Sequence, residues 1–374
     1  MEDKLITIAI HNYARAEILR TRLEAEGVEC YLKNINLIHS VISGGVKVRV
    51  SSRDLEKALR IVEKVSDHFR DEYQDELSTA DRSVQRILVP IDFSDYSVNA
   101  CRYAIGLAEK LNAEIKLMHV YYNPVVNSMP LTDTYYYQVN MDEIIREIEI
   151  RAKTNMEEFY KDLKDKIEKD KIEGVKLDYS LKRGIASEEI IEESRDYKPD
   201  VIIIGTRGRG ERENDLIGSV TAKIIEDSKV PVLVIPEDSL YEGIATINVL
   251  YATNFDESDY IAIKKLMYTL SPFDFRLYCA HIGSEDTNLW DKAKMTGFKE
   301  KLTTHYPDYE IECSVIEDDD FLNGIQNIIR EKRIDIISLV THKRNLISKL
   351  FNPSIARKVL FHTNIPFLVF HADN

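Results

Sequence analysis

The second half of this sequence repeats the pattern of its middle third. The similar segments are separated along the chain by one of two offsets. The matched segments are 200–203 with 335–338 and 230–234 with 365–369, both 135 residues apart, and Asp92-Phe93 with Asn254-Phe255, 162 residues apart. The offsets of 162 and 135 differ by 27 residues, so the second copy lacks that many around 122–149. Such an internal repeat predicts two copies of one fold, each with its own core.

Short apolar runs alternate with amphipathic segments through both copies. Continuous apolar strands are typical of a parallel sheet that is covered on both faces. One predicted helix carries a stripe at 100–111, and a longer stripe runs from Ile144 to Ile167. The alternation predicts two tandem, doubly wound α/β domains at 84–238 and 245–374. The predicted strands are 87–91, 115–120, 201–204 and 230–235 in the first copy and 247–251, 276–281, 336–340 and 365–370 in the second.

A separate small α+β domain is predicted at residues 1–66. Its order is strand 5–10, helix 13–26, strands 28–33 and 46–50, and helix 55–65. The second helix carries an apolar stripe of Leu55, Ala58, Leu59, Val62 and Val65, and we expect Ser51 or Ser52 to cap its start. This order resembles the ferredoxin-like signal-transducing domain of some prokaryotic proteins. The acidic segment 67–83 then reads as a solvated linker.

Composition argues against several classes of protein. The net charge of −14, with no basic stripe of useful length, disfavours nucleic acid as a partner. No apolar run approaches the roughly 20 residues that span a bilayer, and no leader pattern opens the chain, so we expect a cytoplasmic protein without a membrane partner. The four cysteines are widely spaced along the chain, at Cys30, Cys101, Cys279 and Cys313. We therefore expect neither a disulfide framework nor a metal site, and we expect these thiols to be buried and reduced.

A glycine-rich loop follows the predicted strand 201–204. It reads Gly205-Thr206-Arg207-Gly208, then nine residues, then Gly218-Ser219 at the start of a predicted helix. Glycine reaches positive φ and lets the backbone approach a ligand, so loop amides and the helix N-terminus can face phosphate oxygens. A lone Gly-x-x-Gly is common in plain turns, but its place between a buried strand and a helix favours a phosphate site.

This loop, with the strand 230–235 behind it, resembles the ATP-binding branch of the universal stress protein family over residues 84–237. The resemblance implies an adenine nucleotide alpha hydrolase-like, Rossmann-like fold that binds ATP, ADP or AMP, with Mg²⁺ accompanying the triphosphate. It implies that Asp92 contacts the nucleotide and that Val120 lies against adenine. The implied nucleotide site is Pro90, Ile91, Asp92, Val120, Ile204, Gly205, Arg207, Gly208, Gly218, Ser219, Val220 and Thr221. As an alternative, Asp92 or Ser94 caps the following helix.

The basic residues near this loop could neutralise phosphate, or could simply be solvated, as loop arginines often are. They are Arg207, Arg209 and Arg212, together with the turn Lys182-Arg183-Gly184. At the 135-residue offset the second copy has Glu317-Asp318-Asp319 in place of that turn, and Val340, Lys343 and Pro353 in place of the three loop glycines. Ser354 matches Ser219, and at the 162-residue offset Asn254 stands in place of Asp92.

Side chains at the glycine positions fill the space that phosphates would need, and the carboxylates of the turn repel phosphate, so we expect that the second copy binds no ATP.

The leading functional hypothesis is a stress-response or signalling regulator in which one bound nucleotide biases a conformation. A slow ATP hydrolase is one alternative, although no convincing general base is present. An interaction scaffold independent of nucleotide is the other. Pairing of the two last strands would hide both edges in an intramolecular pseudo-dimer. Homo-oligomers and an unidentified protein partner stay open, as does a lid at 132–140, where an exposed loop is the favoured interpretation.

Overall fold

The computed structural model describes most of the chain. The described residues are 5–11, 13–34, 46–62, 85–121, 134–208, 217–237, 239, 243, 246–253, 255, 257–283, 288–317, 321–341 and 365–371. The chain divides into two compact units, residues 1–82 and 83–374. Within the described ranges, every helix is too short or too polar to span a bilayer.

The first unit is a three-stranded antiparallel sheet that packs against helices. Its strands are β1 (Leu5–His11), β2 (Cys30–Asn34) and β3 (Val46–Ser51), in the order β1-β3-β2. Helix α1 (Tyr13–Ala25) contacts all three strands. The small core is formed by Ala16, Leu19, Leu23, Val28, Val48 and Val50, joined by Ala58 and Ile61 from the next helix.

That next helix begins at Leu55, as predicted, but its cap and one residue of its predicted apolar face differ from the prediction. Ala58 N donates to Asp54 O at 2.8 Å, so Asp54 occupies the N-cap position rather than Ser51 or Ser52. Leu59, assigned to the apolar face, is 37% exposed, whereas Ile61 is buried. Leu55 and Val62, also assigned to the apolar face, pack against the core beside Ala58 and Ile61, so this part of the prediction is confirmed.

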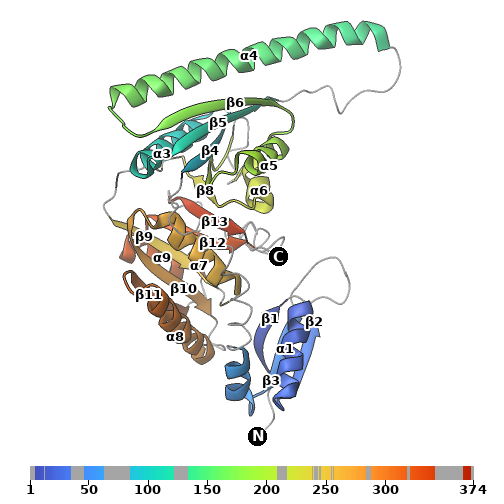
Figure 1. Ribbon diagram of the computed structural model, residues 1–374, viewed down its shortest axis with the longest axis vertical. Helices are drawn as coiled ribbons and strands as arrows, with labels where there is room; N and C mark the ends of the chain where they lie inside the picture. Colours follow the sequence, from blue (N-terminus) through green and yellow to red (C-terminus); the bar gives the residue numbers. More distant parts are fainter. Residues whose placement is uncertain are drawn as a thin grey trace. The chain divides into compact units, whose positions relative to one another are not determined.

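The second unit is built on one ten-stranded sheet with the order β11-β10-β9-β12-β13-β8-β7-β4-β5-β6 (Figure 1). Neighbouring strands are parallel within each half, and β8 pairs antiparallel with β13 at the junction. The first half contains β4 (Arg86–Ile91), β5 (Glu114–Tyr121), β6 (Lys176–Arg183), β7 (Val201–Gly205) and β8 (Val232–Ile235). The second half contains β9 (Thr246–Ala252), β10 (Asp274–Gly283), β11 (Glu310–Glu317), β12 (Ile336–Thr341) and β13 (Phe367–His371).

Helices cover both faces of this sheet, which confirms the doubly wound α/β fold (Figure 1). One core lies beneath α3 (Asp95–Leu111), α4 (Thr134–Lys169), α7 (Glu257–Leu270) and α8 (Asn288–His305). The other lies beneath α5 (Ala186–Tyr197), α6 (Ser219–Asp227) and α9 (Phe321–Lys332). Each core crosses the junction, because the antiparallel pairing of β8 with β13 keeps equivalent faces on the same side.

Hydrogen bonds repeat between the halves at the offsets read from the sequence. The Asp200 carboxylate accepts from Arg86 N at 2.9 Å, and the Asp335 carboxylate accepts from Asn248 N at 2.8 Å. The edge strands require one correction. Tyr121 pairs with Arg183 and Gly283 pairs with Glu317, so Glu317 corresponds to Arg183 and the predicted match with Lys182 is wrong by one residue. Strand register, and not the later offset, fixes this equivalence.

The inserted residues of the first half lengthen one helix. Helix α4 has 36 residues, whereas its counterpart α8 has 18. Figure 1 shows α4 running beside β6 and continuing past the end of the sheet. The favoured prediction of an exposed loop at 132–140 is wrong where the structure describes it, because residues from Thr134 onward are helical.

Candidate functional site

The predicted nucleotide residues meet at the carboxyl ends of neighbouring strands. Strand β4 lies between β7 and β5 in the sheet. The chain leaves β4 into α3 on one face and leaves β7 into α6 on the other, so β4 and β7 flank the point where the winding reverses. In open α/β sheets, ligands bind at this point outside the carboxyl edge.

Asp92 follows β4 directly and organises the turn into α3. Its Oδ1 accepts from Ser94 N at 3.1 Å and from Ser94 Oγ at 2.5 Å. Ser94 Oγ in turn accepts from Ser97 N, and this contact caps α3. The alternative interpretation is therefore confirmed for Ser94, which caps the helix, while Asp92 positions the capping residue through one of its two carboxylate oxygens.

The other oxygen of Asp92 lies against the glycine loop. A Cβ on Gly208 would lie 2.7 Å from Asp92 Oδ2, and a Cβ on Gly205 would lie 2.9 Å from Tyr96 Cβ and 3.0 Å from the Tyr96 carbonyl oxygen. Neither glycine has a positive φ, so the conformational part of the prediction is wrong for these two. At Gly205 the end of β7 approaches the backbone of α3 too closely for a side chain, whereas at Gly208 the absent side chain leaves room for the Asp92 carboxylate.

Helix α6 starts at the same edge and is tied back to β7. Gly218, its N-cap residue, donates from its amide to Thr206 O at 2.8 Å. Thr221 Oγ1 donates to Gly205 O at 2.9 Å, in a buried contact. The first amides of an α-helix have no carbonyl partner within the helix and form an anion-binding end. These two bonds fix that end, at Ser219 and Val220, beside the loop.

Arg207 also lies in the loop, and the protein itself engages its guanidinium. The Arg207 guanidinium sits 4.9 Å from the centre of the Tyr96 ring, and its Nη2 lies 3.9 Å from Glu237 Oε2. Tyr96, which the sequence did not single out, thus contacts both Gly205 and Arg207. Arg209 and Arg212 lie outside the described residues.

Apolar residues complete the edge. Ile91 and Ile204, the last apolar residues of β4 and β7, are buried. Pro90 pairs with Met118 inside the sheet. Val120, near the end of β5, and Val220, in the first turn of α6, both pack against the core beneath α5 and α6.

His119 holds the turn after β4 in place. Its Nδ1 donates to Ile91 O at 2.8 Å, and its ring packs against that of Phe93 at a tilt of 45°, with centroids 4.4 Å apart. Burial lowers the pKa of His119, although the bond to Ile91 and the nearby Asp92 act in the opposite direction. The second half repeats the arrangement with His281 and Phe255, whose rings are 4.3 Å apart. Because the half without the glycine loop has the same pair, its role is structural.

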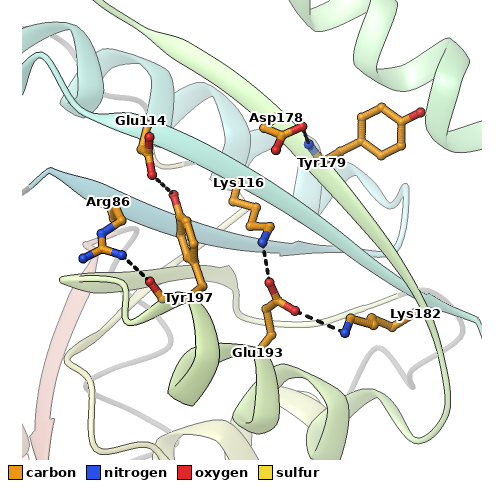
Figure 2. Close-up of polar contacts among 8 residues, drawn as sticks. All are labelled: Arg86, Glu114, Lys116, Asp178, Tyr179, Lys182, Glu193 and Tyr197. Atoms are coloured by element: carbon orange, nitrogen blue, oxygen red, sulfur yellow. Dashed lines mark hydrogen bonds and ion pairs between the residues drawn. The ribbon is translucent and has the colours of Figure 1, made fainter.

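Lys182 takes part in a polar network on the α5 face of the sheet (Figure 2). The buried Glu193 carboxylate lies 2.6 Å from Lys116 Nζ and 3.6 Å from Lys182 Nζ. Tyr197 completes the network by donating from its hydroxyl to Glu114 at 2.9 Å. Lys182 is therefore already paired with a carboxylate in this structure.

The second half has a different residue at the position of Gly205. Gly205 pairs with Ile235, and Val340 pairs with Phe370 at the same place in the other half. Val340 is buried in the core beneath α7. The further differences, at Asn254, Lys343, Pro353 and Ser354, lie outside the described residues.

Comparison with known proteins identifies relatives of the first half of the large unit. The model of the universal stress protein family matches residues 83–236. Universal stress protein MJ0531 of Methanocaldococcus jannaschii is 30% identical over 151 residues, which is 40% of this chain and 81% of that protein. Universal stress protein YxiE of Bacillus subtilis is also 30% identical over 151 residues, 40% of this chain and 97% of that protein.

A solved structure extends the likeness of fold to the second half. A universal stress protein from Archaeoglobus fulgidus superposes with a TM-score of 0.57 at 20% identity, covering 78% of this chain and 98% of that one. A share of 78% exceeds what either half alone supplies. The family model, the two relatives and this shared fold together show that the chain belongs to the universal stress protein family.

Proposed function

We propose that this chain binds one adenine nucleotide, at the carboxyl edge of β4, β5 and β7, and acts as a nucleotide-responsive regulator in a stress response. The contact between Gly208 and Asp92 is the observation that supports this most. A Cβ at position 208 would lie 2.7 Å from Asp92 Oδ2, so glycine lets the loop backbone lie beside the carboxylate without displacing it. The Asp92 carboxylate, which suits the ribose, and the loop amides, which suit the phosphates, therefore lie side by side.

Each part of the edge suits one part of the ligand. The carboxylate of Asp92 can accept hydrogen bonds from ribose hydroxyls. The start of α6 and the loop amides can donate to phosphate oxygens. Val120 offers an apolar surface for adenine. A triphosphate would bring Mg²⁺ as its counterion, and Arg207 would have to exchange Glu237 for phosphate in order to take part.

Binding at one site per chain is part of the proposal. Val340 places a side chain where the first half requires glycine. In the first half a Cβ at the equivalent position, Gly205, would lie 2.9 Å from Tyr96 Cβ, so we infer that the buried Val340 requires a different arrangement in the second half. We therefore expect isothermal titration calorimetry of the full chain with ATP, ADP and AMP to give a stoichiometry of one.

The substitution Asp92→Asn tests the role of the carboxylate. It keeps the shape of the side chain and copies the residue at 254. We expect about tenfold weaker nucleotide binding, or ~1.4 kcal/mol, because a charged acceptor becomes a neutral one. Asp162→Asn, on the exposed side of α4, is the matched control and should leave affinity unchanged. Equal affinity in wild type and Asp92→Asn would refute the site, whereas two nucleotides per chain would refute only its uniqueness.

A further inference from the structure

Two cysteines of the second half lie side by side in the sheet. Cys279 of β10 and Cys313 of β11 are direct partners in the parallel register of these strands. Both thiols are free, and each shifts the pKa of the other. Neighbouring strands are about 4.8 Å apart, which falls within the Cα separation that a disulfide spans. The two sulfurs can therefore be joined with only a small movement of the edge strand.

The two thiols differ in accessibility and in acidity. Cys279 is 1% exposed, and burial raises its pKa well above the usual range. Cys313 is partly exposed. The hydrogen bond from Cys279 lowers the pKa of Cys313, and the positive charge of Lys299 on α8 acts in the same direction against the cost of burial. Cys313 is thus the thiol that ionises and meets an oxidant first, while Cys279 supplies the proton of the hydrogen bond.

The fold itself does not require cysteines at these positions. In the first half the equivalent direct partners are Leu117 and Tyr179. Both pack into the core, and the Tyr179 ring lies 5.0 Å from that of Tyr160. The pair of thiols is therefore a property of the second half, the half that lacks the glycine loop.

We propose that Cys279 and Cys313 form a reversible disulfide when the chain meets a hydroperoxide. The Cys313 thiolate attacks the peroxide oxygen, the O–O bond breaks, and the alcohol or water leaves as Cys313 becomes a sulfenic acid. The sulfur of Cys279 then attacks the Cys313 sulfur, the S–O bond breaks and water leaves. Two thiols and one hydroperoxide give one disulfide, one alcohol and one water, and two small thiols reverse the oxidation.

The proposed disulfide would link the edge strand β11 covalently to β10. Among the strands that the structure describes, β11 is the outermost of the second half, and its one partner there is β10. A disulfide at Cys313, in the middle of β11, would close a covalent ring that contains α8. Oxidation would then slow the local unfolding of β11 from β10, and slower amide hydrogen exchange along β11 would measure this effect.

The test uses the full chain, treated with hydrogen peroxide and analysed by mass spectrometry without reduction. We expect a loss of about 2 Da, two hydrogens, and a peptide in which Cys279 is linked to Cys313. Dithiothreitol should restore the original mass. The proposal is overturned if peroxide leaves both thiols free, or if it links either of them to Cys30 or Cys101 instead.

Substitutions at the two thiols separate their roles, and substitutions at Cys101 and Lys299 supply a control and a test of the nearby charge. Cys279→Ala should stop at a Cys313 sulfenic acid, heavier by about 16 Da and trapped by dimedone. Cys101→Ser, at a buried cysteine of α3 that has no cysteine partner among the described residues, is the control and should form the 279–313 bond as wild type does. Lys299→Gln should slow oxidation by about threefold, because it removes the charge that favours the thiolate. Oxidation at Cys279 in a Cys313→Ser variant at the wild-type rate would contradict the assignment of the attacking thiol.

Discussion

Glu193 shows how a buried carboxylate depends on its partners. Its side chain is 6% exposed, and it pairs with Lys116, whose side chain is 22% exposed, and with Lys182, whose side chain is 44% exposed. A buried charge that loses its only close partner costs far more than a surface pair contributes. The two lysines contact the same carboxylate from differently solvated positions, so they form a matched pair for experiment.

We expect Lys116→Gln to lower the free energy of unfolding by about 3 kcal/mol, because it leaves Glu193 buried without its nearest charge. Lys182→Gln should cost less than about 1 kcal/mol, since water already screens that contact. Urea denaturation of both variants measures the difference. Equal losses would show that Glu193 is more hydrated than its burial indicates.

His119 makes stability depend on pH. Burial lowers its pKa in the folded chain, so below about pH 6.5 the unfolded chain binds the proton more readily than the folded one. The contribution of neutral His119 is therefore present above that pH and is lost as the pH falls toward the folded value. Asn at this position keeps an N–H donor for Ile91 O but does not titrate.

We expect His119→Asn to reduce the slope of unfolding free energy against pH just below about pH 6.5, by up to ~1.4 kcal/mol per pH unit. Urea titrations at several pH values measure that slope. An unchanged slope would mean that His119 stays accessible to protons in the folded chain.

Helix α5 begins without a side-chain cap of the kind that α3 has. Ser94 caps α3 with its hydroxyl, whereas the N-cap residue of α5 is Ile185, which makes no side-chain bond to the helix and is 46% exposed. Its backbone is already extended, at φ −89° and ψ 120°, as a capping serine requires. The backbone of Ile185 therefore suits an N-cap residue, whereas its side chain lacks a hydrogen-bond acceptor.

We expect Ile185→Ser to stabilise the large unit by about 1 kcal/mol, because a hydroxyl would satisfy an amide of the first turn. Ile185→Ala removes the same exposed apolar surface without supplying an acceptor, and should give no comparable gain. Thermal unfolding of the two variants makes the comparison. A gain shared by both would assign the effect to the lost apolar surface.

The elements that the sequence revealed are those with continuous apolar runs. Eight strands of the large unit were predicted within a few residues of their ends, but the edge strands β6 and β11 were not. Only one face of β6 is apolar, with Leu177 and Tyr179 alternating with Lys176 and Asp178, and such a strand resembles a loop when apolar runs are the signal. The alternation itself, which is typical of half-exposed strands, would have found it.

The sequence gives the position of the candidate site residues along the chain, but not their contacts. Asp92 and the glycines are marked by their position after buried strands. The approach of Gly208 to Asp92, and of Gly205 to Tyr96, depends on how β7 and α3 pack, and no local pattern encodes that distance. The pairing of Cys279 with Cys313 was hidden for the same reason, because register between strands is a tertiary property.

The ten-stranded sheet makes the two halves of the large unit depend on one another. The antiparallel pairs Phe367–Val234, Leu368–Leu233 and Val369–Val232 join them, and the strands on both sides are buried. Without β13, strand β8 would present an unpaired edge of apolar residues, which recruits another strand.

We therefore expect residues 83–244, produced alone, to form a homodimer in which a second β8 replaces β13. Size-exclusion chromatography with light scattering measures the mass. Leu233→Lys should weaken that dimer, because it would place two charges at the centre of the new junction. A monomeric fragment would show that pairing of β8 is dispensable.

Joining two similar halves by a peptide chain has an evolutionary consequence. In an assembly of identical subunits every substitution is inherited by both sides, so both ends of the sheet must change together. Here Gly205 and Val340, which hold equivalent places beside the junction, are separate codons. Selection can therefore preserve the glycine loop in the first half while the second half acquires thiols or a helix of different length. Two identical subunits could not differ in this way.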